Sequence, residues 1–447
     1  MSHRRIAGPA HQTGIGERTK PYKCVGIGVG PSNLSLAAFL HDHADTPALF
    51  LDRKPDFGWH DGQQVPGAGL QVSMFKDLVS LVDPTNPFSF TAYLTEMGRM
   101  YHFLNAGFDA VPRLEFRNYL AWAANRNPDV AFGEEVLEVE FDELFRVHTD
   151  RRSIWTENIS VGVGTEPWTP PFALIDSIPS QFHVSEFMPR ARALAGKRVA
   201  VVGGGQSGAE AFLDLLSRPA GELPESVTWI SRRPTFLPMD DSPFTNEFFM
   251  PCYSDHFAGL ELDLRRAHND RHILASDGVS EPTLRAIYQA LYQHHFLNEV
   301  APQCPLRPHR EVVAVDGIGG GAWRVSCTHL QTGELEQVEV DVVIWATGFR
   351  PARVDFLKPL AHRFRRVGEE IQVDRDFAAV WDGPADRALF VQNAARVQRG
   401  LADPNLSLVA WRGKRIADRI RGVRGRDPLA AFAAWTPVGE RQRVIAP

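Results

Sequence analysis

Three glycines, Gly203, Gly205 and Gly208, have a spacing that points directly to chemistry. They fit the pattern G-x-G-x-x-G, in which absent side chains allow a tight turn and a close approach of backbone to a pyrophosphate. A buried strand over 199–202 precedes them, and residues 209–216 follow with helical spacing. The stretch predicts a dinucleotide site with the phosphates at the helix N-terminus. The alternative is an ordinary glycine-rich loop of an α/β domain.

A similar strand, glycine loop and helix occur near the N-terminus, in YKCVGIGVGPSNLSLAAFL (22–40). Its turn-forming residues are Gly26, Gly28, Gly30 and, where the third glycine of the pattern would fall, Pro31. Asp52 ends the next apolar strand, 48–52. The dinucleotide-binding pattern has a carboxylate at this place for the ribose hydroxyls. The alternative is a surface acid at the end of a strand. Two nucleotide sites in one chain indicate electron transfer between two bound dinucleotides, as in a flavoprotein that uses NAD(P)H.

The second unit continues into a strand at 226–230 that ends in Ser231-Arg232-Arg233. An acid at this place hydrogen-bonds the 2′-hydroxyl of NAD, whereas an arginine accommodates the 2′-phosphate of NADP. Arg232 and Arg233 therefore predict NADPH as the nucleotide of the second site.

Composition narrows the class of protein. The chain has 447 residues, enough for two to three domains, and its net charge of −6 gives no electrostatic basis for binding nucleic acid or an anionic membrane. No apolar run approaches the roughly 18 residues of a membrane span. The four cysteines form no Cys-x-x-Cys, which argues against a disulfide reductase and favours the cytoplasm. The sixteen histidines show no H-E-x-x-H spacing, so we expect no metal site.

Residues 57–87 are rich in glycine and proline and follow neither a helical nor a strand period. Irregular stretches of this length inside a compact domain are usually functional. Lys76 lies there within the apolar segment MFKDLVSLV. Its ammonium group either meets an anionic partner in a cavity or reaches the surface along an apolar stem, and composition alone favours the surface.

Several longer blocks identify a family. They are GIGVGPSNLSLA (26–37), FGWH (57–60), LQVSMFKDLVSLVDPTNPFSF (70–90), VVGGGQSGAE (201–210), DSPFTNEFF (241–249), ATGF (346–349) and DPNLSLVAWR (403–412). Through them the chain, over roughly residues 22–420, resembles the N-hydroxylating flavin monooxygenases of siderophore biosynthesis, which include lysine N6-, ornithine N5- and diamine N-hydroxylases. Ser-Asp-Gly at 276–278 is more similar to the lysine and diamine enzymes.

The resemblance implies roles for individual residues. FAD would be bound by Gly26, Gly28, Gly30, Pro31, Asn33, Asp52 and Gln71, and NADPH by Gly203, Gly205, Gln206, Ser207 and Gly208, with Arg232 and Arg233. Further cofactor contacts would come from Trp59, His60, Thr347, Gly348, Asn405 and Leu406. The substrate would meet Lys76, Asn246 and Ser407, which reverses the interpretation of Lys76 from composition.

We therefore expect an α/β protein with two Rossmann-like dinucleotide-binding domains, the NADPH domain inserted into the FAD domain, and a small substrate-binding region. The predicted limits are a disordered tail (1–20), an FAD domain (21–165 and 335–447), an NADPH domain (190–300) with substrate-pocket segments near 240–295, and a connecting hairpin (301–334). A turn-rich linker places the boundary between the domains near 166–195.

The resemblance also implies the reaction. FAD reduced by NADPH would activate O2 and hydroxylate the terminal primary amine of L-lysine or an aliphatic diamine, with no catalytic side chain beyond the flavin. The segment 274–278 lacks the asparagines of the ornithine enzymes, and Arg399 stands where the family often has histidine. Cadaverine, putrescine, 1,3-diaminopropane and ornithine remain alternative substrates, and another FAD/NADPH oxidoreductase remains an alternative enzyme. The expected partners are the amine and O2, within a homo-oligomer, a dimer or a tetramer.

Overall fold

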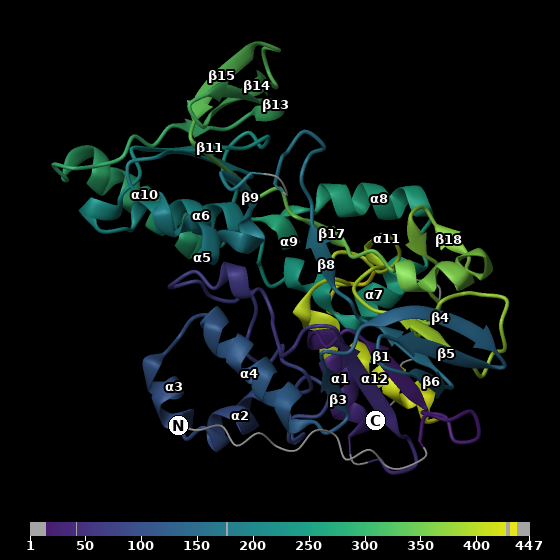
Figure 1. Cartoon of the computed structure of the whole chain (residues 1–447). Coiled ribbons are helices and arrows are strands. Elements are labelled where there is room, and N and C mark those ends of the chain that lie inside the picture. The colour runs from purple at the N-terminus through teal and green to yellow at the C-terminus, as the bar shows by residue number, and fades with distance from the viewer. Residues whose placement is uncertain (1–14, 42, 176–177, 426–429, 436–447) are drawn as a thin grey trace.

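The computed structural model describes residues 15–41, 43–175, 178–425 and 430–435. A five-stranded parallel sheet with the order β20-β7-β1-β2-β3 organises the first unit (Figure 1). Its strands are β1 (Cys24–Ile27), β2 (Ala48–Asp52), β3 (Val130–Phe132), β7 (Ile159–Val161) and β20 (Leu389–Val391). Every residue of β1 and β2 is buried, as is typical of a parallel sheet covered on both faces.

Helices cover one face of this sheet. They are α1 (Pro31–Leu40), α2 (Phe90–Glu96), α3 (Met100–Ala106), α4 (Arg113–Arg126) and α12 (Val409–Ile420). Nine of the ten residues of α1 are buried, because α4 and α12 pack around it. An antiparallel sheet of β4 (Val136–Asp142), β5 (Leu144–Thr149) and β6 (Ser153–Thr156) packs on the other side, with the short strands β18 (Arg366–Val367) and β19 (Glu370–Ile371).

A second five-stranded parallel sheet has the order β12-β11-β10-β16-β9. Its strands are β9 (Gln181–His183), β10 (Arg198–Val202), β11 (Ser226–Ile230), β12 (Leu306–Arg307) and β16 (Val342–Trp345). Helices α6 (Gln206–Leu216) and α10 (Glu281–Phe296) pack together on one face (Figure 1). The antiparallel strands β13 (Arg310–Gly319), β14 (Ala322–His329) and β15 (Leu335–Val340) pack on the other.

Two neighbouring strands carry the chain between the units. β8 (Thr165–Pro167) leaves the first unit, β17 (Phe349–Pro351) returns to it, and the two pair antiparallel. The second unit is therefore an insertion. Its limits differ from those predicted, since β9 lies before residue 190, and β15 and β16, which were assigned to the FAD domain, belong to the second unit. Only the pairing of β16 with β10 and with β9 assigns these short strands to the second unit.

The short helices α5 (Phe187–Arg190), α7 (Pro251–Ala258), α8 (Leu262–Arg271), α9 (Leu274–Asp277) and α11 (Arg396–Arg399) complete the fold. Of the predicted disordered tail, residues 1–14 lie outside the described part, but residues 15–20 form an ordered turn, which corrects that prediction. Gly16 adopts φ +95° there, the Trp155 amide donates to its carbonyl at 2.8 Å, and the Arg18 guanidinium stacks on the Trp155 ring. No helix in the described part of the chain is long and apolar enough to cross a membrane.

Candidate active site

The two glycine loops end in helices that begin in the same way. Gly30 precedes α1 with φ −98° and ψ −179°, and Gly205 precedes α6 with φ −97° and ψ −179°. Neither helix has a side-chain cap or an acidic residue in its first turn, so both offer free N–H groups to an anion. A Cβ at either glycine would have no atom closer than 3.8 Å, so each loop leaves an open cradle in front of its helix. Both cradles fit the pyrophosphate of a dinucleotide.

The other glycines of the first loop serve packing. A Cβ at Gly26 would lie 2.1 Å from the Phe50 ring, so this glycine lets β2 pack on β1. Gly28 has φ +87°, and a Cβ there would meet the Gly162 carbonyl oxygen at 2.6 Å, so the turn itself requires glycine. Pro31 is the first residue of α1, where its missing N–H has no consequence.

Asn33 and Asp52 hold the first loop in shape. The Asn33 amide nitrogen donates to the Gly28 carbonyl at 2.8 Å, and its oxygen accepts from the Ser160 hydroxyl at 2.7 Å and from Gln392 at 2.8 Å. The Asp52 carboxylate, at the end of β2, accepts from the Val29 amide at 2.9 Å. Both side chains are buried, so Asn33 supports the cradle from within, while Asp52 lies at the strand end predicted to meet the ribose.

The second loop places its glycines and arginines differently. A Cβ at Gly203 would lie 2.0 Å from the Ala346 carbonyl oxygen, and one at Gly208 would lie 2.3 Å from the Gly203 carbonyl oxygen, so both are needed for close packing. Arg233 donates to the Gly204 carbonyl at 3.2 Å and is committed to the loop. The Arg232 side chain is 72% exposed, and among the residues that the structure describes its one ion-pair partner is Glu311, at 3.5 Å. Arg232 is thus the arginine available to a phosphate.

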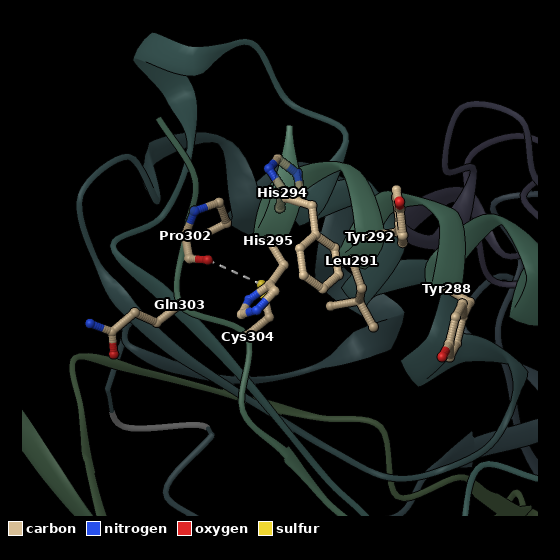
Figure 2. A pocket seen from close by; sticks show the side chains of 9 residues that line it. Tyr288, Leu291, Tyr292, His294, His295, Pro302, Gln303 and Cys304 are labelled. Atoms are coloured by element: carbon tan, nitrogen blue, oxygen red, sulfur yellow. Dashed lines mark hydrogen bonds between the residues drawn. The ribbon is translucent and has the colours of Figure 1, made fainter. Parts of the chain in front are cut away.

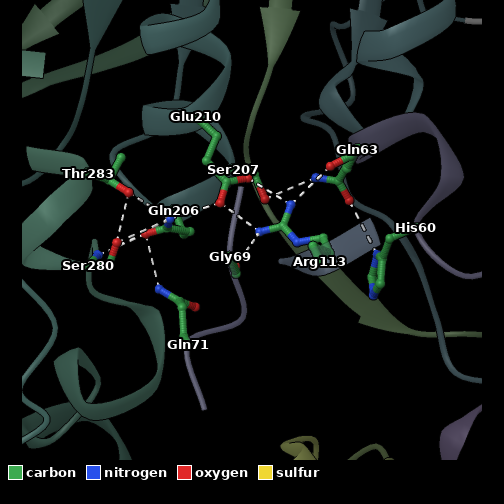
Figure 3. Close-up of polar contacts among 10 residues, drawn as sticks. All are labelled: His60, Gln63, Gly69, Gln71, Arg113, Gln206, Ser207, Glu210, Ser280 and Thr283. Carbon is green, nitrogen blue, oxygen red and sulfur yellow. Dashed lines mark hydrogen bonds and ion pairs between the residues drawn. The ribbon is translucent and has the colours of Figure 1, made fainter. Parts of the chain in front are cut away.

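Glutamines join the two units at the second loop (Figure 3). Gln71 Nε2 donates to Gln206 Oε1 at 3.0 Å, and Gln63 Nε2 donates to the Ser207 hydroxyl at 3.0 Å. Gln206 also accepts from the Ser280 amide at 2.8 Å. Gln71, which is predicted to lie beside the flavin, therefore contacts the loop that is predicted to bind NADPH. The side chains of Gln206 and Ser207 both form hydrogen bonds to the first unit.

An ion pair that the sequence did not indicate lies beside these glutamines. Arg113, the first residue of α4, pairs with Glu210 of α6 through contacts of 2.6 and 2.8 Å (Figure 3). The two side chains are 14% and 6% exposed. In the sequence each residue is typical of an exposed charge on a helix. The two side chains become buried because the two units pack against each other at this place.

Four predicted cofactor contacts lie near the passage between the units. Trp59 packs on the core of the first unit and edge-on to His60, with ring centroids 4.7 Å apart. The His60 ring lies 6.2 Å from that of Phe349, the residue after Gly348. The Thr347 hydroxyl donates to the Trp168 carbonyl at 2.6 Å, and Gly348 adopts φ +94°. The structure brings these residues to one place, where the chain returns through β17.

The predicted substrate residues meet around Phe249. Lys76 Nζ lies 5.7 Å from the centroid of the Phe249 ring. The exposed Asn246 precedes Phe249 by three residues in the chain. Phe249 packs in one small core cluster with Ala275 and Leu408. Burial lowers the pKa of Lys76, and its ammonium has no acidic partner among the residues that the structure describes. A half-buried, unpaired cation next to an apolar cluster is suited to a carboxylate ligand.

Asn405, Leu406 and Ser407 border this cluster but use their polar groups internally. The Asn405 side chain accepts from the Ser407 amide at 2.9 Å and from its hydroxyl at 2.7 Å, as a cap of the following turn. Leu406 packs on the core of the first unit. Ser407 is 4% exposed, and its hydroxyl already donates to Asn405. This hydroxyl therefore supports the local structure and is not free to bind a ligand.

Comparison with known proteins identifies the family. The family described as L-lysine 6-monooxygenase/L-ornithine 5-monooxygenase matches residues 20–351. The chain is also 39% identical over 402 residues to the L-lysine N6-monooxygenase of Escherichia coli, across 89% of this chain and 94% of that protein. The chain belongs to this family.

Solved structures agree with this membership. The FAD-bound cadaverine monooxygenase of the desferrioxamine pathway from Erwinia amylovora superposes with a TM-score of 0.86 at 25% identity, over 94% of this chain and 100% of that one. The Kutzneria sp. 744 ornithine N-hydroxylase, solved with reduced FAD, NADP+ and L-ornithine, gives a TM-score of 0.82 at 29% identity over 90% and 99%. The resemblance found in the sequence and the predicted two-domain α/β fold are confirmed, and the chain is an N-monooxygenase of this family.

Proposed function

We propose that the protein hydroxylates the terminal amine of L-lysine, with FAD in the first glycine loop and NADPH in the second, for hydroxamate siderophore biosynthesis. The contact between Gln71 and Gln206 carries this proposal. It joins the segment predicted to lie beside the flavin to the loop predicted to hold the nicotinamide nucleotide. Two dinucleotides bound on either side of this contact would meet at their reactive rings.

FAD bound in the first glycine loop would, once reduced, activate O2, which supplies the oxygen atom that the amine receives. The protein's own groups bind and orient the reactants and exclude water. The apolar cluster of Phe249, Ala275 and Leu408 provides a dry wall for the aliphatic chain. The α-amino acid head would lie toward Lys76, so the terminal amine would lie along the apolar wall, where desolvation favours its neutral form.

The electrostatics around Lys76 favour an amino acid over a diamine. A carboxylate would pair with the ammonium of Lys76, whereas the distal ammonium of a diamine would be repelled by it. Arg399, at first sight another carboxylate partner, is 2% exposed and paired with Asp255 at 2.7 Å, so it is not available. Arg396 pairs with Asp277 at 2.8 Å, and both side chains are partly exposed. This pair offers a zwitterionic head one group of each sign.

A diamine is the second candidate. The carboxylate of Asp277 is 44% exposed and lies in the segment that lacks the asparagines of ornithine enzymes. It would accept the distal ammonium of cadaverine if Arg396 moved away. Similarity to the cadaverine monooxygenase of Erwinia amylovora supports this alternative.

Product formation with matched amines tests the proposal. NADPH oxidation and hydroxylamine release are measured together with L-lysine, L-ornithine, cadaverine, putrescine and 1,3-diaminopropane. We expect L-lysine to give the highest kcat/KM. Hydroxylamine from a diamine at tenfold higher kcat/KM would overturn the choice of lysine, and NADPH oxidation with no hydroxylamine from any amine would overturn the proposed function.

The Lys76→Met variant tests the role of the cation. It should raise the KM for L-lysine and uncouple the reaction, so that H2O2 rises while hydroxylamine falls. Lys76→Arg, which keeps the charge, should recover part of the coupling. If Lys76→Met leaves KM and coupling unchanged, Lys76 is a surface residue and the carboxylate is bound elsewhere.

We further propose that the enzyme acts in the cytoplasm, where NADPH is supplied, and as a homo-oligomer.

A further inference from the structure

Helix α10 has an apolar outer face that nothing in the described structure covers. Its inner face packs Leu284, Ile287 and Leu291 against α6 and the second sheet. On the outer face, Tyr288 is 76% exposed, Tyr292 54% and Phe296 65%. A helix with apolar residues on both sides is typical of one buried between two bodies.

The apolar surface continues beyond the end of α10. Leu297 and Val300 are 67% and 61% exposed. Beside them lies a hollow of about 570 Å³ between the end of the helix and the chain at 302–304, where Cys304 lies half-buried (Figure 2). The chain then enters β12, an edge strand of the second sheet. Apolar patches of this extent on a protein surface mark interaction sites.

The aromatic side chains of this face are symmetric about Tyr292. Tyr288 lies four residues before it, and Phe296, the last residue of α10, lies four residues after it. An antiparallel helix pair around a two-fold axis sets residues of equal and opposite offset against each other. Tyr288 would then pack on Phe296 of the partner subunit. Such a self-complementary patch is what a two-fold interface requires.

We propose that two copies of the chain associate through α10, antiparallel, with the two-fold axis at Tyr292.

The size of the patch agrees with a second copy as its occupant. Aromatic side chains bury about 150–250 Å² each, so three rings with Leu297 and Val300 approach the roughly 800 Å² per partner of a standard interface. Another exposed apolar patch, on α3, carries Tyr101 and Leu104. Within α3 no third large apolar side chain is exposed, so this patch is smaller. The α3 patch therefore serves as the control.

Association would also act on the second glycine loop. The N-terminal end of α10 holds Gln206 through the Ser280 amide and the Thr283 hydroxyl, which lie 2.8 and 3.2 Å from it (Figure 3). A partner subunit bound to the outer face would restrain α10 and, through it, the second glycine loop.

Sedimentation velocity of the FAD-loaded protein tests the interface. We expect the wild type to form dimers, or larger assemblies built from them, at micromolar concentration. Tyr292→Arg, which sets two cations against each other on the axis, should halve the mass, while Leu104→Arg on α3 leaves it unchanged. A monomeric wild type, or a Tyr292→Arg variant with the wild-type mass and normal flavin content, would overturn the proposal.

Cysteine cross-linking tests the position of the axis. In a Cys304→Ser background, Tyr292→Cys should form a disulfide-linked dimer on mild oxidation, because position 292 meets itself and a disulfide requires Cβ atoms about 3.5–4.5 Å apart. Tyr288→Cys alone should not link, but it should link to a Phe296→Cys copy in a mixture. Efficient linking of Leu104→Cys and none at position 292 would assign the interface to α3 instead.

Discussion

The two glycine loops have nearly the same backbone at the start of their helices but are held in place by different means. The first loop is fixed by buried side chains of its own unit, above all Asn33 and Asp52. The second has supports in its own unit, such as Arg233, but is also held from outside, by Gln71, Gln63 and Arg113 of the first unit. The loop geometry is thus common to both, and the supports are specific to each.

This difference matches two kinds of cofactor binding. A loop with buried, satisfied supports is preorganised and stays formed whether or not its ligand is present. A loop whose half-buried side chains bond to another unit changes its contacts whenever that unit moves. We infer that the first loop is built for a permanently held dinucleotide and the second for one that binds and leaves in each turnover.

The largest expected effect is at Asn33. Asn33→Ala would leave Ser160 and Gln392, which are 0% and 3% exposed, without this partner. Each buried unsatisfied group costs about 1–3 kcal/mol, so the variant should lose several kcal/mol of unfolding free energy and most of its FAD. Urea denaturation and flavin absorbance per mole of protein measure the two losses.

Gln206→Ala is the matched change in the second loop. Gln206 is half-buried, and water can replace its bonds, so we expect a loss of about 1 kcal/mol and normal FAD content. The contrast between the loops would be broken if Gln206→Ala cost as much stability as Asn33→Ala.

The second effect in size concerns the ion pair between the units. Arg113→Met leaves the carboxylate of Glu210 buried without its partner, which should cost about 3–5 kcal/mol. The double variant Arg113→Met, Glu210→Met removes both charges and should recover most of this loss. Urea denaturation of the wild type, Arg113→Met, Glu210→Met and the double variant provides the measurement. Equal stability of the single and double variants would show that the pair does not hold the units together.

Acid should weaken the second unit through His183. Its Nε2 donates to the Gly348 carbonyl at 3.0 Å and its Nδ1 accepts from the Ser185 amide at 3.1 Å, so the neutral ring is satisfied. Burial lowers the pKa of His183 from 6.5 to about 4. Between these values the unfolded chain binds a proton that the folded protein does not, so stability falls as pH drops from 6.5 toward 4.

This loss amounts to about 3 kcal/mol at its limit, at 1.36 kcal/mol for each pKa unit. His183→Gln keeps the donor to Gly348 and cannot titrate, so its unfolding free energy should depend less on pH across this window. Denaturation at pH 7 and pH 4.5 measures the difference. Parallel pH profiles for the two proteins would contradict the assignment.

The sequence predicted the parts of the site that are local. Glycine spacing next to a buried strand located both loops, because the turn and the close approach of backbone restrict those positions to glycine. Position 28, at φ +87°, is such a case. The blocks around Lys76 and Asn246 pointed to one site; Lys76 lies beside the ring of Phe249, and Asn246 belongs to the same short helical turn as Phe249.

The parts missed depend on contacts between distant segments. The pairing of Arg113 with Glu210 spans 97 positions, and neither residue differs in type from a solvated helix charge. The limits of the inserted unit were wrong because the unit to which β9 and β16 belong is set by the pairing of β16 with β10 and of β9 with β16. Arg399, which stands where the family often has histidine, pairs with Asp255, a residue 144 positions away that the sequence does not link to it.

A smaller effect, on nucleotide binding, separates Arg232 from Arg233. Arg232 is exposed and loosely paired, so it is free to bind a 2′-phosphate, whereas Arg233 donates to the Asp277 carbonyl at 2.9 Å and supports the loop. Arg232→Ala should therefore raise the KM for NADPH by the equivalent of about 1.5–3 kcal/mol, the worth of a charged hydrogen bond, and leave the KM for NADH unchanged. Arg233→Ala should raise both KM values together, because the loop binds the part that the two nucleotides share. Steady-state kinetics with each nucleotide decides between them. If Arg232→Ala weakens NADH as much as NADPH, or if the wild type uses the two nucleotides equally, then the 2′-phosphate is not recognised here, and the second loop differs from the first only in its supports.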